Sequence, residues 1–184
     1  MATKKVSAVD IKELYYGEID LIKEDLTAEA LKTLLAKKGT ELKQVTNIHQ
    51  DTWTIEEAEA SQESYTDQLS GLTYRRGAKT MGDLTFNFTI GRYDYATKKD
   101  FIGGATIGEN GWKRSRGAKD IEYCLIALTE DDQYCILPVA SIKAREAQTD
   151  KAIGIAVVGT MLIPEVESVA PEYWFDKSAV DAES

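Results

Sequence analysis

Histidine and cysteine are scarce in this chain of 184 residues, and each shortage excludes a kind of chemistry. A single histidine, His49, excludes metal sites built from several histidines and leaves one candidate for the base of a catalytic triad. His49 lies in a polar stretch between two extended segments, which favours a loop residue without a catalytic role. We therefore expect no enzymatic activity, no cofactor and no bound metal.

Cys124 and Cys135 are the two cysteines, and they do not form a CxxC pair. Secreted scaffolds that depend on disulfides usually contain more cysteines. Both residues fall on the arms of a predicted hairpin, in which Cys124 would face Leu137 and Cys135 would lie diagonal to Cys124. A diagonal pair is usually too far apart for a disulfide, so we predict two buried free thiols.

Long apolar runs and low-complexity tracts are also missing. No window approaches the ~20 apolar residues that a membrane helix requires, and the first residues are too polar for a signal-peptide core. The three prolines provide no proline-rich linker. We expect one soluble domain over residues 1–184 without a membrane partner, with an N-terminal strand or arm over 1–24 and a C-terminal tail over 165–184.

Charge is distributed unevenly along the chain, whose net charge is −9. Residues 51–70 contain six acidic residues and no basic one, whereas residues 71–120 contain ten basic and five acidic residues. Phosphate backbones repel acidic proteins, so ordinary binding to duplex DNA is disfavoured. Segments of opposite charge favour instead a contact between neighbouring copies of the chain.

Apolar periodicity predicts a mainly β fold of the α+β class with one flanking amphipathic helix. The segment Leu84–Ile90 alternates strictly, with apolar side chains on one face and Thr85, Asn87 and Thr89 on the other, as in a strand with one dry and one wet face. Further strands are predicted over 121–128, 133–142 and 152–163, and an extended segment over 45–60.

Helix signals are confined to two places. Ala28, Leu31, Leu34 and Leu35 share one face of a helix that Asp25 or Thr27 can cap and Gly39 ends, with Lys37 and Lys38 in its last turn. A second, shorter helix is predicted from a cap at Asp94 through Phe101 to Gly103-Gly104. Near the C-terminus, Tyr173, Trp174 and Phe175 are expected to dock onto their own domain or onto a neighbour.

Two charged clusters are the candidates for a functional surface. The spacing of the carboxylates in the acidic cluster matches no EF-hand loop. A solvated or interface-facing acidic strip is favoured over catalytic or calcium-binding roles. The residues of this cluster are Glu56, Glu57, Glu59 and Glu63. A basic run beside Trp112 is compatible with an exposed loop, a subunit contact or nucleic-acid binding; its cations are Lys113, Arg114, Arg116 and Lys119. The glycines that precede the basic run lack the lysine and serine or threonine of a phosphate-binding loop.

Several segments together resemble the tail-tube proteins (major tail proteins) of Bacteroides-type phages and prophages. The resemblance covers roughly residues 40–165 and has no invariant catalytic signature. Its segments are Thr46 to Thr54, Glu56-Glu57-Ala58-Glu59, Tyr65, Leu72-Thr73-Tyr74-Arg75-Arg76, Gly82 to Phe88 followed by Tyr93-Asp94, and Val157-Val158-Gly159-Thr160-Met161 leading to Pro164.

The resemblance implies a two-sheet β-sandwich or half-barrel that forms rings, usually hexameric, which stack into a DNA-conducting tube. Related subunits form the inner tube of type VI secretion systems. The expected partners are other copies and other tail proteins, with DNA only as passing cargo, and the expected location is the virion tail after assembly in the bacterial cytoplasm. Thr85, Asn87 and Thr89 are then candidates for the lumen-facing surface.

Two other functions fit the same sequence. One is a different virion component (a head–tail connector, a tail terminator or a capsid decoration protein) or a secretion-tube subunit. The other is a β-sandwich that binds a small ligand or a carbohydrate, because one fold supports many functions.

Overall fold

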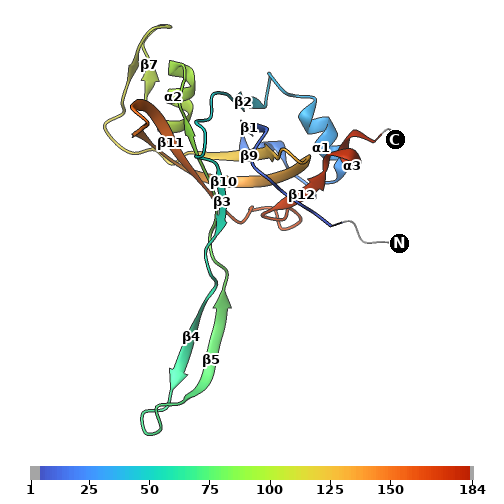
Figure 1. The fold of residues 1–184 in the computed structure, drawn as a ribbon, viewed down its shortest axis with the longest axis vertical. Coiled ribbons are helices and arrows are strands. Elements are labelled where there is room, and N and C mark those ends of the chain that lie inside the picture. Colours follow the sequence, from blue (N-terminus) through green and yellow to red (C-terminus); the bar gives the residue numbers. More distant parts are fainter. Residues whose placement is uncertain (1–4, 183–184) are drawn as a thin grey trace.

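A computed structural model describes residues 5–182, and it shows a β-rich body from which a long hairpin projects (Figure 1). The mainly β fold class is confirmed, with a large antiparallel sheet and two small hairpins. The strands are β1 (Glu13–Gly17), β2 (Lys43–Val45), β3 (Thr54–Glu57), β4 (Ser61–Thr66), β5 (Thr73–Thr80), β6 (Leu84–Ile90), β7 (Ala105–Thr106), β8 (Trp112–Lys113), β9 (Glu122–Leu128), β10 (Gln133–Thr149), β11 (Ala152–Met161) and β12 (Tyr173–Asp176). The helices are the 3-10 turn η1 (Ile19–Leu21), α1 (Ala28–Leu35), α2 (Tyr95–Ile102) and α3 (Lys177–Asp181).

The main sheet has the strand order β2-β1-β9-β10-β11-β6-β3, and β12 joins it at β10. Strand β10 is longer than predicted, and it pairs with β12 along its first residues and with β11 from Ala140 onward. An irregularity between Leu137 and Ala140 separates the two halves of its pairing with β9. Pro138 lies in this irregularity, where a residue without a backbone N–H is tolerated.

Each face of the sheet carries its own hydrophobic core. The first core contains the apolar face of β6, and Leu84, Phe86, Phe88 and Ile90 are all buried there, as predicted. Trp53 packs edge-on against Phe86, with the ring centroids 5.2 Å apart. The strict alternation of this strand therefore marks one side of the first core.

The second core lies on the opposite face, under α1, α3 and the C-terminal segment. Helix α1 begins as predicted, because the Thr27 hydroxyl accepts a hydrogen bond from the Ala30 amide. The helix buries Leu31 and Leu34 against the sheet. Lys37 and Lys38 lie beyond its end rather than in its last turn, because α1 ends at Leu35.

The predicted hairpin forms, but its register differs from the prediction by one residue. Leu125, and not Cys124, pairs with Leu137, because the turn is centred on Asp131 and Asp132 adopts a left-handed φ of 61°. Cys124 and Cys135 consequently lie on opposite faces of the sheet, in separate cores. The two buried free thiols are confirmed, and burial raises the pKa of Cys124 to about 12.

Candidate assembly surfaces

The β4–β5 hairpin, which we call the arm, extends away from the body into solvent (Figure 1). Every residue of its two strands is exposed except Gly77, which is half-buried. The arm has no core beneath it, yet it carries large apolar side chains that are 44–96% exposed. These side chains are Tyr65, Leu69, Leu72, Tyr74 and, at its base, Met81.

The tip of the arm is shaped by its own side chains. The Asp67 carboxylate accepts hydrogen bonds from the amides of Leu69 and Ser70 at 3.2 and 3.0 Å, and from the Ser70 hydroxyl. These bonds, first the one from the Ser70 hydroxyl, lower the pKa of Asp67. Gly71 follows with a left-handed φ of 71°, which glycine adopts without strain. The tip therefore has a defined turn even though nothing covers it.

The base of the arm is continuous with the β3–β6 ladder of the body. The Ala58 amide donates to the Asp83 carbonyl at 3.0 Å, where the two segments that form the arm leave the sheet. A Cβ at Gly82 would lie 1.7 Å from the Ala58 carbonyl oxygen, so only glycine permits this close approach. The acidic side chains of this region, which we call the acidic base, are Glu56, Glu57, Glu59, Glu63 and Asp83.

The acidic base is not neutralised within the subunit. Residues 51–70 and 80–91 contain no lysine, arginine or histidine. In the described part of the chain, none of the five carboxylates forms an ion pair. All five residues are exposed, so each carboxylate remains accessible to an external partner.

The polar face of β6 also differs in part from the prediction. Thr85 and Asn87 are half-buried on the outer face of the sheet, and the Asn87 amide donates to the Thr54 hydroxyl at 3.1 Å. Thr89 was expected on the wet face, but it is buried, with only 8% of its surface exposed. The loop before β3 covers it, because the Thr89 amide donates to the Thr52 hydroxyl and its carbonyl accepts from the His49 amide.

The outer face continues from β6 across its neighbours. Thr85 pairs with Thr160 of β11 on one side and with Glu56 of β3 on the other. Thr160 in turn pairs with Ser141 of β10, and Lys143 and Arg145 follow along the same face of β10. The face is thus acidic at the β3 edge, uncharged over β6 and β11, and basic along β10.

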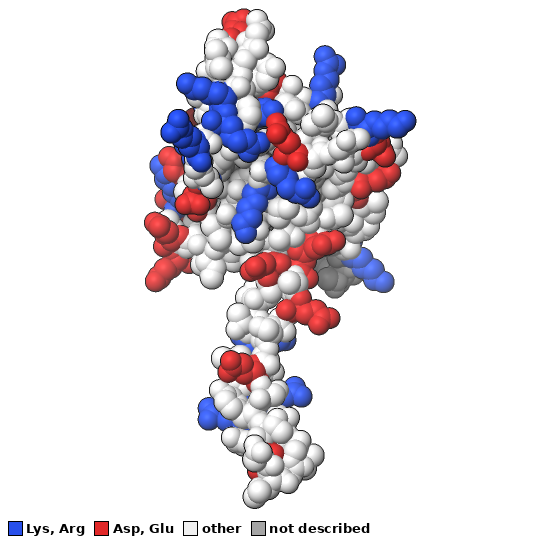
Figure 2. All heavy atoms as spheres, turned by 90° about the vertical axis from the view of Figure 1, so that its left-hand side faces the viewer, with Lys and Arg blue, Asp and Glu red and all other residues white. Residues whose placement is uncertain are grey.

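The basic run lies at the end of the body far from the arm (Figures 1 and 2). It begins at Lys113 in β8 and continues into the loop after the short β7–β8 hairpin, which replaces part of the predicted glycine-rich loop. Its cations Lys113, Arg114, Arg116 and Lys119 are all exposed. An open cavity of about 530 Å³ lies between this loop and β10, and Lys143 adds a further cation to its lining.

One member of the basic run has a partner in the same subunit. Arg114 donates to a Glu146 carboxylate oxygen at 3.1 Å, and Glu146 also forms an ion pair with Lys98 of α2. The acidic residues singled out in the sequence are not these partners. The structure therefore does not bring the predicted acidic and basic clusters together within one subunit.

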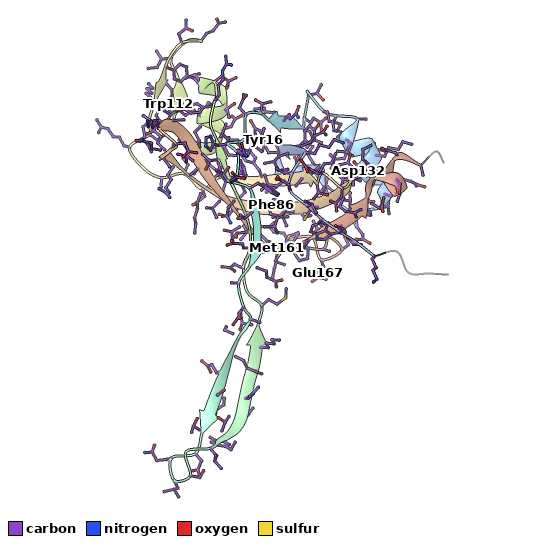
Figure 3. All side chains as sticks on the ribbon, viewed as in Figure 1. Tyr16, Phe86, Trp112, Asp132, Met161 and Glu167 are labelled. Carbon is purple, nitrogen blue, oxygen red and sulfur yellow. The ribbon has the colours of Figure 1, made fainter. Side chains whose placement is uncertain are left out.

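Trp112 is half-buried and makes its contacts within the subunit. Its indole N–H donates to the Gly103 carbonyl at 2.9 Å (Figure 3), and its ring lies 4.4 Å from the Lys98 ammonium group. The ring thereby helps to hold the β7–β8 hairpin against α2. This arrangement disfavours the stacking contact that the nucleic-acid interpretation of the basic run included.

The remaining candidates do not form a chemical site. His49 lies 3.1 Å from the Asp150 carboxylate, which comes from the β10–β11 turn. Among residues 5–182, no group of three or more metal-ligating side chains converges. None of the helices in that same part of the chain has the length and apolar character of a membrane-spanning segment.

No protein-family model matches this chain, and the comparison with curated proteins finds no match. Function must therefore be argued from the surfaces described above.

The arm is the main structural feature that the sequence does not predict. Two signals could have indicated it. Residues 61–80 combine strand-forming residues without the strict apolar alternation of a core strand, and Asp67, Ser70 and Gly71 are typical of a turn at their centre. A hairpin without such an alternation does not complete either core of the body.

Proposed function

We propose that this protein is the structural subunit of a phage tail tube, which self-assembles into stacked rings around a DNA-conducting channel. The exposed arm is the single observation that carries the proposal. An isolated two-stranded hairpin is marginally stable in water, and clustered apolar side chains on a surface favour a protein contact. Neighbouring copies would cover the arm and bury its tyrosines and leucines.

The remaining features support the same assignment. The body is a large antiparallel sheet with a polar outer face, and Thr85 and Asn87 on that face are uncharged. The uncharged part of this face, over β6 and β11, would form a channel wall that lets DNA pass without binding it, in a protein of net charge −9. In this proposal the partners are other copies and other tail proteins, DNA is cargo only, and the subunit performs no catalysis.

The proposal can be tested by removing the arm. Residues 61–80 would be replaced by an Asn-Gly turn, which suits a two-residue hairpin connection. We expect the wild-type chain to form rings or tubes in negative-stain electron microscopy at high concentration, and the armless variant to remain monomeric. Circular dichroism should show that the body keeps its β structure, because the arm contributes to neither core.

A matched pair of arm variants separates apolar contact from arm length. Leu72→Ser with Tyr74→Ser should prevent assembly, whereas Gln62→Ser with Lys79→Ser should not, because only the first pair removes exposed apolar surface. A wild-type chain that stays monomeric at millimolar concentration in every salt condition contradicts the proposal. Closed rings that never stack would favour a tail terminator or connector instead.

A further inference from the structure

The body carries two exposed regions of opposite charge, one where the arm leaves it and one at its far end (Figure 1). The acidic base surrounds the start of the arm, and the basic run lies beyond β8 at the other end of the body (Figures 1 and 2). The two regions cannot neutralise each other within one subunit, because the body separates them. Each is therefore available to a second copy.

The basic region is positively charged and also lines a cleft. Arg114, Arg116, Lys119 and Lys143 line the cavity of about 530 Å³, and Asp120 is the acidic residue in its lining. Arg116, Lys119 and Lys143 form no ion pair in the described part of the chain. We call this feature the basic cleft.

The backbone of the cleft loop is also unpaired. Within residues 5–182, the amides from Ser115 to Lys119 donate to no other protein group. Backbone N–H groups and arginine side chains are both strong donors to carboxylate oxygens, and arginine can bind a carboxylate through two parallel bonds. The chemistry of the cleft therefore fits carboxylates as ligands.

We infer that the basic cleft of one copy binds the acidic base of the next copy, head to tail. This inference rests on the proposed self-assembly and specifies the contact that gives it direction. The two surfaces lie on different parts of the subunit, so the contact is heterologous, and each copy can bind one neighbour through its cleft and another through its acidic base. Repetition then produces a ring or a continuing stack with one direction, rather than a two-fold dimer.

Salt should weaken this contact in a characteristic way. Charges exposed at the rim of an interface are screened over about 10 Å at 0.1 M salt, whereas apolar burial by the arm is not screened. We expect the concentration required for assembly to rise roughly tenfold or more between low and high salt. The arm and the charged contact thus contribute by separable mechanisms.

The experiment uses two complementary charge-reversal variants of the full-length chain. One variant is Arg116→Glu with Lys119→Glu, and the other is Glu57→Lys with Glu59→Lys. We expect each variant alone to remain unassembled in sedimentation velocity at low salt, because both contact surfaces then carry the same sign of charge. An equimolar mixture should assemble, because each altered surface meets an altered partner and each native surface meets a native one.

Two controls exclude damage to the fold. Both variants should keep the melting temperature of the wild-type monomer, and reversal of Lys23 and Lys37, which form exposed ion pairs beside α1, should leave assembly unchanged. Normal assembly of either variant alone, or a mixture that fails to assemble, overturns the inference and leaves the proposed function standing. Absence of assembly in the wild type overturns both.

Discussion

Lys98 shows how a single charged residue is kept in a nearly buried position. Only 9% of its surface is exposed, and its ammonium group lies over the rings of Trp112 and Tyr93 while it pairs with Glu146. Aromatic faces attract cations, and the carboxylate supplies the countercharge. Glu146 is also bound by Arg114, so this one carboxylate connects α2, the loop after β8 and β10.

Replacement of Glu146 by Gln should lower the free energy of unfolding at neutral pH. The hydrogen bond from Lys98, together with the charges of Lys98 and Arg114, lowers the pKa of Glu146 below its ordinary value of 4.5. A lowered folded-state pKa means that the stabilisation is present above about pH 4.5 and is lost as the pH falls through the folded-state pKa. We expect a loss of about 1 kcal/mol or less at pH 7, because solvent screens a carboxylate that is more than a third exposed.

Urea denaturation of wild type and Glu146→Gln at about pH 7 and about pH 3 measures this difference, and Trp112 fluorescence reports on the same site. The difference should shrink at the lower pH, because the stabilisation is lost as the pH falls through the lowered folded-state pKa of Glu146. Glu165→Gln changes an exposed glutamate without an ion pair in the described chain, and it should have no effect at either pH. An undiminished difference at pH 3 would show that packing, not charge, explains the loss.

Strand β12 shows how the C-terminal segment becomes part of the sheet. It pairs with β10 from Gln133 to Ile136, beside the part of β10 that β11 does not reach. The aromatic tail thus docks onto its own domain, which decides between the two alternatives open from the sequence. The Tyr173 hydroxyl completes this docking, because it accepts from the amides of Ala170 and Leu26 and donates to the Asp25 carboxylate.

Tyr173→Phe should destabilise the body by about 1–2 kcal/mol, because it removes one hydroxyl that satisfies two amides and a carboxylate. Thermal or urea denaturation measures the loss. Tyr95→Phe is the matched control, since Tyr95 is 41% exposed and its hydroxyl has no hydrogen bond in the described part of the chain. Equal stability of the two variants would mean that the tail is held by its apolar side chains alone.

The whole molecule combines a body with two cores and an arm with none. Stability within such a molecule is uneven, because an element with few buried contacts opens at little cost in free energy. The arm also contains three of the chain's basic residues, Arg75, Arg76 and Lys79, each of them exposed. A trypsin site in the arm is therefore both accessible and locally unstable.

Limited trypsin digestion of the unassembled subunit should cleave first within residues 75–79, as mass spectrometry of the fragments would show. The body should resist longer at its buried strands. Assembled protein should be protected at the same sites, because the proposed function places the arm against neighbouring copies. Cleavage of the arm at one rate in both forms would argue against arm-mediated assembly.

Some features follow from the sequence alone because their causes are local. The strand Leu84–Ile90 has the predicted bounds and buried face, since alternation along a strand directly determines which side chains share a face. Helix α2 begins at the Asp94 cap, whose carboxylate accepts from the Thr97 amide at 2.7 Å, and ends before Gly103, whose φ is 83°. Caps and glycine stops act within a few residues, so a linear pattern contains them.

Other features depend on which segments meet in space, and only the tertiary structure decided them. The register that separates Cys124 from Cys135, the burial of Thr89 and the pairing of Arg114 with Glu146 all depend on partners distant in the sequence. The projection of the arm has the same origin. Whether such a hairpin lies on a sheet or extends into solvent also depends on the space that the other strands occupy, which its own residues do not encode.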